Sequence, residues 1–255
     1  GLCRFSQEKG FLWSTKISWN SFPMGGRRFA DVGAAPVIGV PPAGDELLRP
    51  KSTPFSHLSP KLATNSRDAV VMTQEGVDLY SLADGQKGFS VPGGGAVPLA
   101  VAANEAEILA SMPTGLASIA LPGLKESLTV PPATFTSMDA DASVLIGASP
   151  EGVWIRQSAF TPVTLPSTVK SIALGAAGTF WFVGDEGEAA FVGQAAFSGE
   201  ILRLLRPAAD EPKPEKIRAS KTGEKFTVLE SLPGLQRLRM MTRSEGGEWT
   251  IEWER

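Results

Sequence analysis

The sequence predicts an all-β fold built from repeated units of short antiparallel strands, and three observations lead to it. The 255 residues include 27 Gly and 20 Pro, more than a helical protein tolerates, so turns must be frequent. The apolar segments are only a few residues long and are rich in β-branched and aromatic residues, which is typical of buried strands. Glycine or proline bounds these segments at regular intervals.

A segment of one outline recurs along the chain. In its clearest copy, residues 135–152, a first strand leads through a short polar turn into the strand SVLIG, and Gly152 then begins a hairpin. Glycine suits that position because a tight hairpin turn needs a positive φ. The six copies are residues 29–44, 62–76, 99–115, 135–152, 172–187 and 217–234.

Two further strands follow the glycine in most copies. The third strand is a segment such as VWIRQ, directly after Gly152, and the fourth is a segment such as VTL, which ends before Pro166. Proline cannot donate to a strand ladder, so it marks the point where the chain leaves one unit. Four short strands with a period near forty residues predict a propeller blade. We therefore expect a single β-propeller of four-stranded antiparallel blades, with six blades and seven as the alternative.

This outline resembles β-propeller repeat proteins of the WD40-like, kelch-like and RCC1-like kind over about residues 28–255. The resemblance rests on architecture, since the Gly-His and Trp-Asp pairs of WD40 repeats and the double glycine of kelch repeats are absent. It implies a rigid scaffold whose function lies in the loops and on the faces.

Three stretches lie outside the repeat. Residues 1–27 form an N-terminal extension in which aromatic and apolar residues alternate, so we expect a strand there that closes the ring with the alternating C-terminal stretch. Residues 45–61 and 202–216 are rich in proline and charge, and we expect both to be loop insertions in the 28–255 propeller domain.

Charge is unevenly distributed along the chain. Residues 69–200 carry 4 basic and 13 acidic groups, whereas residues 201–255 carry 11 basic and 9 acidic groups. Basic ends on a nearly neutral protein suggest a face for an anionic partner, although solvated surface charge explains the same pattern. The candidate partner-binding residues are Arg203, Arg206, Lys213, Lys216, Arg237 and Arg239, with Trp13 and Trp19 as aromatic anchors or, alternatively, as ring-closing core.

The composition also limits the chemistry. Cys3 and His57 are the only residues of their types, so an intrachain disulfide and a zinc site of the usual kind are excluded. No apolar run is long enough to span a membrane, and we expect a soluble protein. The first residues are rich in Arg, Lys and Ser, which is shared by organellar transit peptides and suggests a mitochondrial or other organellar location.

Candidate catalytic motifs are incomplete. Asp139 and Asp141 have the spacing of a calcium loop, but Val144 stands where that loop needs glycine. Ser149 lies in a loose likeness of a nucleophile elbow, yet it aligns with the hairpin turns of the other copies. We interpret these three polar residues as turn residues.

The sequence therefore favours a non-catalytic scaffold subunit of a larger protein or ribonucleoprotein assembly, without a cofactor, substrate or membrane span. One alternative is a propeller hydrolase with a metal site built from loops around Asp31, Asp139 and Asp141. A second alternative is a subunit that contacts RNA through the basic C-terminal edge.

Overall fold

The computed structural model describes residues 2–6, 10–15, 21–24, 28–31, 37–39 and most of 62–254, and it describes side chains only within residues 63–241. Inside 62–254 the residues that are not described are 66, 74, 75, 82–86, 94–96, 122, 124, 188, 209, 220–224, 233, 234 and 244–248. The described residues form strands, turns and bends. No helix among them is long and apolar enough to cross a membrane.

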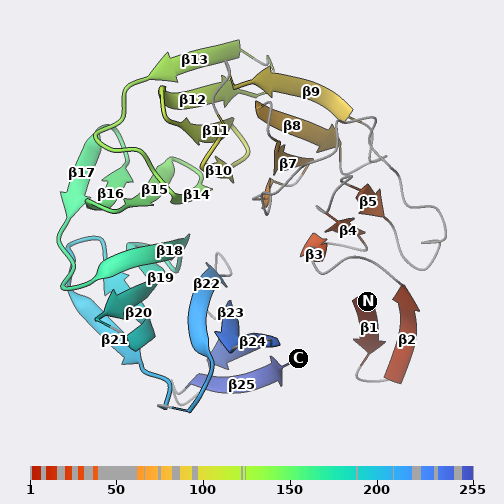
Figure 1. Ribbon diagram of the computed structural model, residues 1–255. Helices are drawn as coiled ribbons and strands as arrows, with labels where there is room; N and C mark the ends of the chain where they lie inside the picture. The colour runs from red at the N-terminus through yellow and green to blue at the C-terminus, as the bar shows by residue number, and fades with distance from the viewer. Residues whose placement is uncertain are drawn as a thin grey trace. The chain divides into compact units, whose positions relative to one another are not determined.

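The described strands form seven sheets, five of which have four strands (Figure 1). The first of the five contains β6 (Leu62–Thr64), β7 (Asp68–Met72), β8 (Gly76–Ser81) and β9 (Lys87–Pro92). The second contains β10 (Ala100–Ala103), β11 (Glu107–Met112), β12 (Gly115–Ala120) and β13 (Lys125–Thr129). The third contains β14 (Ser137–Asp141), β15 (Val144–Ser149), β16 (Gly152–Arg156) and β17 (Phe160–Val163).

The fourth four-stranded sheet contains β18 (Thr168–Leu174), β19 (Thr179–Glu186), β20 (Ala189–Ala196) and β21 (Ile201–Leu205). The fifth contains β22 (Lys213–Ala219), β23 (Lys225–Leu232), β24 (Leu235–Arg243) and β25 (Trp249–Glu254). A three-stranded sheet contains β3 (Ser21–Met24), β4 (Arg28–Asp31) and β5 (Val37–Gly39), and β1 (Leu2–Ser6) pairs with β2 (Gly10–Thr15).

The chain divides into two compact units. The first comprises residues 1–114 and 118–125, and the second comprises residues 115–117 and 126–255. The β1–β2, β3–β5 and β6–β9 sheets belong to the first unit, together with β10 and β11. The β14–β17, β18–β21 and β22–β25 sheets belong to the second.

The predicted repeat is confirmed at the level of strands. Each of the six repeat segments supplies two neighbouring strands of a separate sheet, and the last five of these sheets have the predicted four strands in chain order. The blade number of six stays a prediction, as does the ring-closing role of residues 1–27. Among the described pairings, the four strands of the last sheet all come from residues 213–254.

The hairpin glycines behave as predicted where they are described. Gly76, Gly115 and Gly152 have φ values of 149°, 148° and 145°, a region that residues with a Cβ rarely adopt. A Cβ on Gly76 would lie 1.9 Å from the carbonyl oxygen of Val91 in the fourth strand. Glycine is therefore required there both by the turn and by the close approach of the outer strand.

One of the two predicted insertions was wrong in its extent. Within 202–216, residues 202–205 belong to β21 and residues 213–216 belong to β22. Only residues 206–212 connect these strands, because residues 201–205, ILRLL, form the fourth strand of their own sheet. The other predicted insertion, 45–61, lies outside the described residues.

Aromatic side chains fill the spaces between sheets in the second unit. Phe180, Phe182 and Phe191 are buried with the aliphatic side chains of the β14–β17 sheet, and the Phe182 and Phe191 rings meet edge to face at 5.9 Å. A second cluster joins the β18–β21 and β22–β25 sheets, with the Trp181 and Phe226 ring centroids 4.3 Å apart. These clusters form the core of this unit.

Side chains of first strands also bond to the backbone of the next sheet. The Ser137 hydroxyl accepts a hydrogen bond from the Ile172 backbone N–H at 3.1 Å. The Ser171 hydroxyl accepts one from the Ile217 N–H at the same distance, one sheet further on. The carboxylate of Asp139 accepts a third from the Leu174 N–H at 2.8 Å. Sheets that are not joined by a strand ladder are thereby tied along their first strands.

Candidate partner-binding site

Arg206, one of the predicted partner-binding cations, is held within its own sheet. Its guanidinium forms an ion pair with Glu186 at 2.8 Å and lies over the Phe191 ring, 5.0 Å from the centroid. Arg203 lies three residues earlier, in β21, and is half-buried. The sequence does not indicate the partner of Arg206, because that partner depends on which strands pair.

Arg239 is also engaged inside the protein. Its guanidinium lies 3.5 Å from the carboxylate of Glu230, which is 4% exposed, and 3.8 Å from the more exposed carboxylate of Glu211. A buried carboxylate requires such a counter-charge, because an unpaired charge is costly away from water. Arg239 therefore neutralises a buried carboxylate in the β22–β25 sheet.

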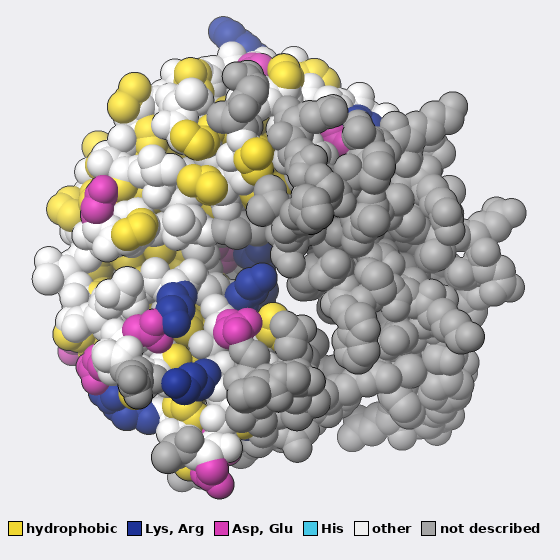
Figure 2. Space-filling view, in the orientation of Figure 1, with side chains coloured by type: hydrophobic (Ala, Val, Ile, Leu, Met, Phe, Trp, Pro, Cys, Tyr) yellow, Lys and Arg dark blue, Asp and Glu magenta, His cyan; other side chains and the backbone are white. Residues whose placement is uncertain are grey.

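The other predicted contacts are described only in part. Lys213 and Lys216 are exposed on β22. Arg237 lies in β24 and Trp13 lies in β2, with side chains that are not described, and Trp19 lies outside the described residues. On the face shown in Figure 2, basic and acidic side chains lie next to one another over the β18–β25 part of the molecule. The charge there is mixed rather than uniformly basic.

The acidic residues of the metal alternative have other roles where they are described. Besides its bond to Leu174, Asp139 accepts a hydrogen bond from the Ala140 N–H at 2.9 Å. The Asp31 side chain is not described. Among the described residues, no group of three or more His, Cys, Asp or Glu side chains is placed to hold a metal ion. Ser149 is buried and its hydroxyl accepts a bond from the Glu151 N–H, as expected of a turn residue.

A polar cluster around the buried Asp78 in the β6–β9 sheet was not predicted. Asp78 is 5% exposed and forms an ion pair with Lys87 at 2.8 Å. The Ser90 hydroxyl donates to the same carboxylate at 2.7 Å, and the Tyr80 hydroxyl donates to it at 3.3 Å. All four residues belong to β8 and β9, so the cluster ties the outer strand to the sheet.

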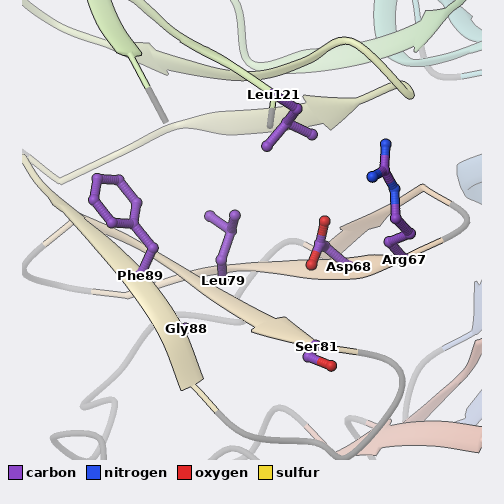
Figure 3. A pocket seen from close by; sticks show the side chains of 7 residues that line it. All are labelled: Arg67, Asp68, Leu79, Ser81, Gly88, Phe89 and Leu121. Atoms are coloured by element: carbon purple, nitrogen blue, oxygen red, sulfur yellow. The ribbon is translucent and has the colours of Figure 1, made fainter. Parts of the chain in front are cut away.

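The first unit contains an open groove. It encloses about 270 Å³ between the β6–β9 sheet and the turn that follows β12. Figure 3 shows Leu121 on one wall opposite Leu79, with Phe89 towards one end and the two charged residues at the other. Its lining residues are Arg67, Asp68, Leu79, Ser81, Gly88, Phe89 and Leu121.

Two asparagines hold the walls of this groove in place. Asn65 accepts hydrogen bonds from the backbone N–H groups of Arg67 and Asp68 at 2.8 and 2.6 Å, which shapes the β6–β7 turn. Its side-chain amide donates to the backbone oxygen of Asn104 at 3.1 Å. The Asn65 side chain thereby fixes the β6–β7 turn against the β10–β11 turn.

The opposite wall continues from Asn104. The Asn104 side chain accepts a hydrogen bond from the Ala106 N–H at 2.9 Å, and the Ala106 carbonyl accepts one from the Leu121 N–H at 2.7 Å. A continuous series of hydrogen bonds therefore joins the turn that carries Arg67 to the residue that forms the far wall. Two asparagine side chains and one backbone hydrogen bond therefore hold the walls of the groove.

Gly88 lines the groove within β9. Leu79 pairs with Phe89 and Tyr80 pairs with Lys87, so Gly88 is the extra residue of a β-bulge. A Cβ built on Gly88 would meet no atom within 4 Å. Nothing in the sequence distinguishes this glycine from a turn glycine, because its place in the groove depends on the pairing of β8 with β9.

Comparison with solved structures shows that the chain has the β-propeller fold. The WD40 repeats of RRP9 superpose with a TM-score of 0.69 at 11% identity, covering 89% of this chain and 76% of that chain. The structure of U3-55K gives a TM-score of 0.66 at 11% identity, with 89% and 77% covered. A chain of the mitotic checkpoint complex gives 0.65 at 12% identity, with 89% and 76% covered.

The predicted resemblance to WD40-like propeller proteins is thereby confirmed for the fold. No protein-family model matches the chain, and no curated protein matches it in sequence. The likeness lies in the arrangement of strands.

Proposed function

We propose that the chain is a non-catalytic β-propeller scaffold, a subunit of a larger protein assembly. The observation that carries this proposal is the preformed groove of the first unit, which combines apolar walls with two charged side chains on a rigid sheet. Protein partners bind to such surfaces through a large side chain in a pocket with a polar rim. The mitotic checkpoint complex, which contains a similar chain, supports an assembly role by analogy.

The proposed compartment is an organelle, because the first residues are rich in basic and serine residues and poor in acids. Fractionation of cells that express the untruncated protein tests this part separately. Recovery in the cytosol alone would contradict it and would leave the scaffold proposal intact.

Isolation of the native protein under mild conditions tests the scaffold proposal itself. We expect one or more proteins to co-purify in fixed stoichiometry, and cross-linking to place them on the propeller. A monomer that carries no partner at physiological concentration would contradict the proposal.

Two measurements on the same preparation separate the alternatives. A stoichiometric bound cation would favour the hydrolase built around Asp31, Asp139 and Asp141. Binding of a mixed RNA pool that weakens steeply with salt would favour the RNA-contacting subunit, because neutralised phosphates release counterions. The ion pairs of Arg206 and Arg239 reduce the charge available for such a contact.

A further inference from the structure

We infer that the groove of the first unit binds an extended, uncharged segment of a partner protein, which inserts one large apolar side chain. This inference rests on the proposed scaffold function and adds the place and the chemistry of the contact. The groove is defined by the seven lining residues shown in Figure 3.

The walls select an apolar side chain. Leu79 is buried, and Phe89 and Leu121 are half-buried, so a guest between them would remove further apolar surface from water. The volume of about 270 Å³ lies just below the range of small-molecule pockets, which begins at ~300 Å³. It therefore suits one large side chain of a polypeptide better than a drug-sized ligand.

The polar end selects against charge of either sign. Arg67 lies in the β6–β7 turn and Asp68 is the first residue of β7, and neither side chain makes a hydrogen bond or an ion pair with another described residue. A cation next to Asp68 would be repelled by Arg67, and an anion next to Arg67 would be repelled by Asp68. A peptide unit satisfies both, because its carbonyl accepts from the guanidinium and its N–H donates to the carboxylate.

A guest that offers free peptide groups to Arg67 and Asp68 must be extended. In a helix the backbone carbonyl and N–H groups are already bonded within the helix, and only those near its ends are available. An extended segment presents free backbone groups on both sides of the inserted side chain. The predicted motif is a leucine, methionine or phenylalanine with uncharged neighbours.

Selection of phage-displayed random heptapeptides on the full chain provides the test. We expect enrichment of a large apolar residue between uncharged residues. The most enriched synthetic peptide should lose about tenfold or more in affinity on Gly88→Trp, which places a large side chain on a residue that lines the groove. Thr161→Trp, on the exposed outer strand β17, is the matched control and should change the affinity less than about twofold.

Two charge variants test the polar end and do not depend on a bulky substitution. Arg67→Gln leaves Asp68 as the only charged residue of the groove lining, so the enriched peptides should contain more Lys and Arg. Asp68→Asn should instead enrich peptides that contain Asp and Glu. Thermal unfolding of all four variants checks that each is folded. The inference is overturned if no peptide is enriched, if the peptide binds Gly88→Trp as well as wild type, or if both charge variants leave the enriched sequences unchanged.

Failure of the groove inference can be distinguished from failure of the scaffold proposal. Native partners that co-purify equally with wild type and with folded Gly88→Trp would overturn the groove as the docking site and leave the scaffold intact. Loss of a native partner on Gly88→Trp, with retention on Thr161→Trp, would support both.

Discussion

Two junctions between neighbouring sheets are built differently. Between the β14–β17 and β18–β21 sheets, buried phenylalanines fill the space, and Ser137 and Asp139 tie the first strands together. Between the β6–β9 and β10–β13 sheets, Asn65 supplies the tie and a groove stays open beside it. Polar bonds hold sheets together at both junctions, and both also contain buried apolar side chains. They differ in that a groove stays open beside the junction of the β6–β9 and β10–β13 sheets, where a partner has room to bind.

Glycine has opposite consequences at the two junctions. A Cβ on Gly193 would lie 2.3 Å from the Phe182 ring, so that glycine makes room for a core side chain. A Cβ on Gly88 would meet nothing within 4 Å, so that glycine leaves space empty. The same residue type therefore marks dense packing in one place and an open site in the other.

The largest expected effect comes from emptying the filled junction. Phe182→Ala should lower the free energy of unfolding by about 3–5 kcal/mol, because Phe182 is fully buried among other rings. Phe89→Ala in the groove should cost less than about 2 kcal/mol, because Phe89 is half-buried. Urea denaturation measures both. Equal losses would show that the junctions are packed alike.

Alanine in place of Gly193 or Gly88 should give the next largest difference in stability. Gly193→Ala should lower the free energy of unfolding by about 1–3 kcal/mol, because its methyl group would overpack the Phe182 ring. Gly88→Ala should stay within about 0.5 kcal/mol of wild type. Thermal and urea unfolding of the two variants side by side check this, and a destabilised Gly88→Ala would contradict an open groove.

Removing one tie between sheets should have an intermediate effect. Ser171→Ala leaves the N–H of the buried Ile217 without its acceptor and should cost about 1–3 kcal/mol. Amide hydrogen exchange at Ile217 should accelerate in the variant. The exposed Ser158→Ala is the control, expected within about 0.5 kcal/mol, and unchanged exchange at Ile217 would count against the tie.

The smallest effect concerns the surface ion pair of Arg206 and Glu186. Their side chains are 47% and 41% exposed, so a double-mutant cycle with Arg206→Gln and Glu186→Gln should give a coupling of about 0.2–1 kcal/mol. The coupling should fall as salt is added. A coupling that salt does not change would indicate that the hydrogen bond between the two side chains, and not their charge, dominates the interaction.

The strand pattern could be predicted from sequence because it is local. A hairpin at Gly152 needs its glycine whatever packs around it, and the confirmed φ values at Gly76 and Gly115 follow the same rule. The loop predicted over 202–216 failed because ILRLL is a strand only by pairing with β20. A short apolar run flanked by proline has no local signal that separates a strand from a loop.

The candidate site could not be predicted in this way. Asp139 was interpreted as a turn residue, yet one of its carboxylate oxygens bonds to Leu174, 35 residues further along. Asn65 likewise acts on Asn104, 39 residues away. Neither partner is indicated by spacing, because each depends on which sheets lie side by side.

The sequence by itself determined the all-β class, the repeat and the positions of the hairpin glycines. These features follow from propensity, alternation and backbone sterics, which act over a few residues. Only the tertiary structure decided that Arg206 and Arg239 are paired within their sheets and that a groove lies between Leu79 and Leu121. The reason is physical, since an ion pair or a groove needs groups that separate strands bring together. The order of those groups along the chain does not determine how far apart they lie.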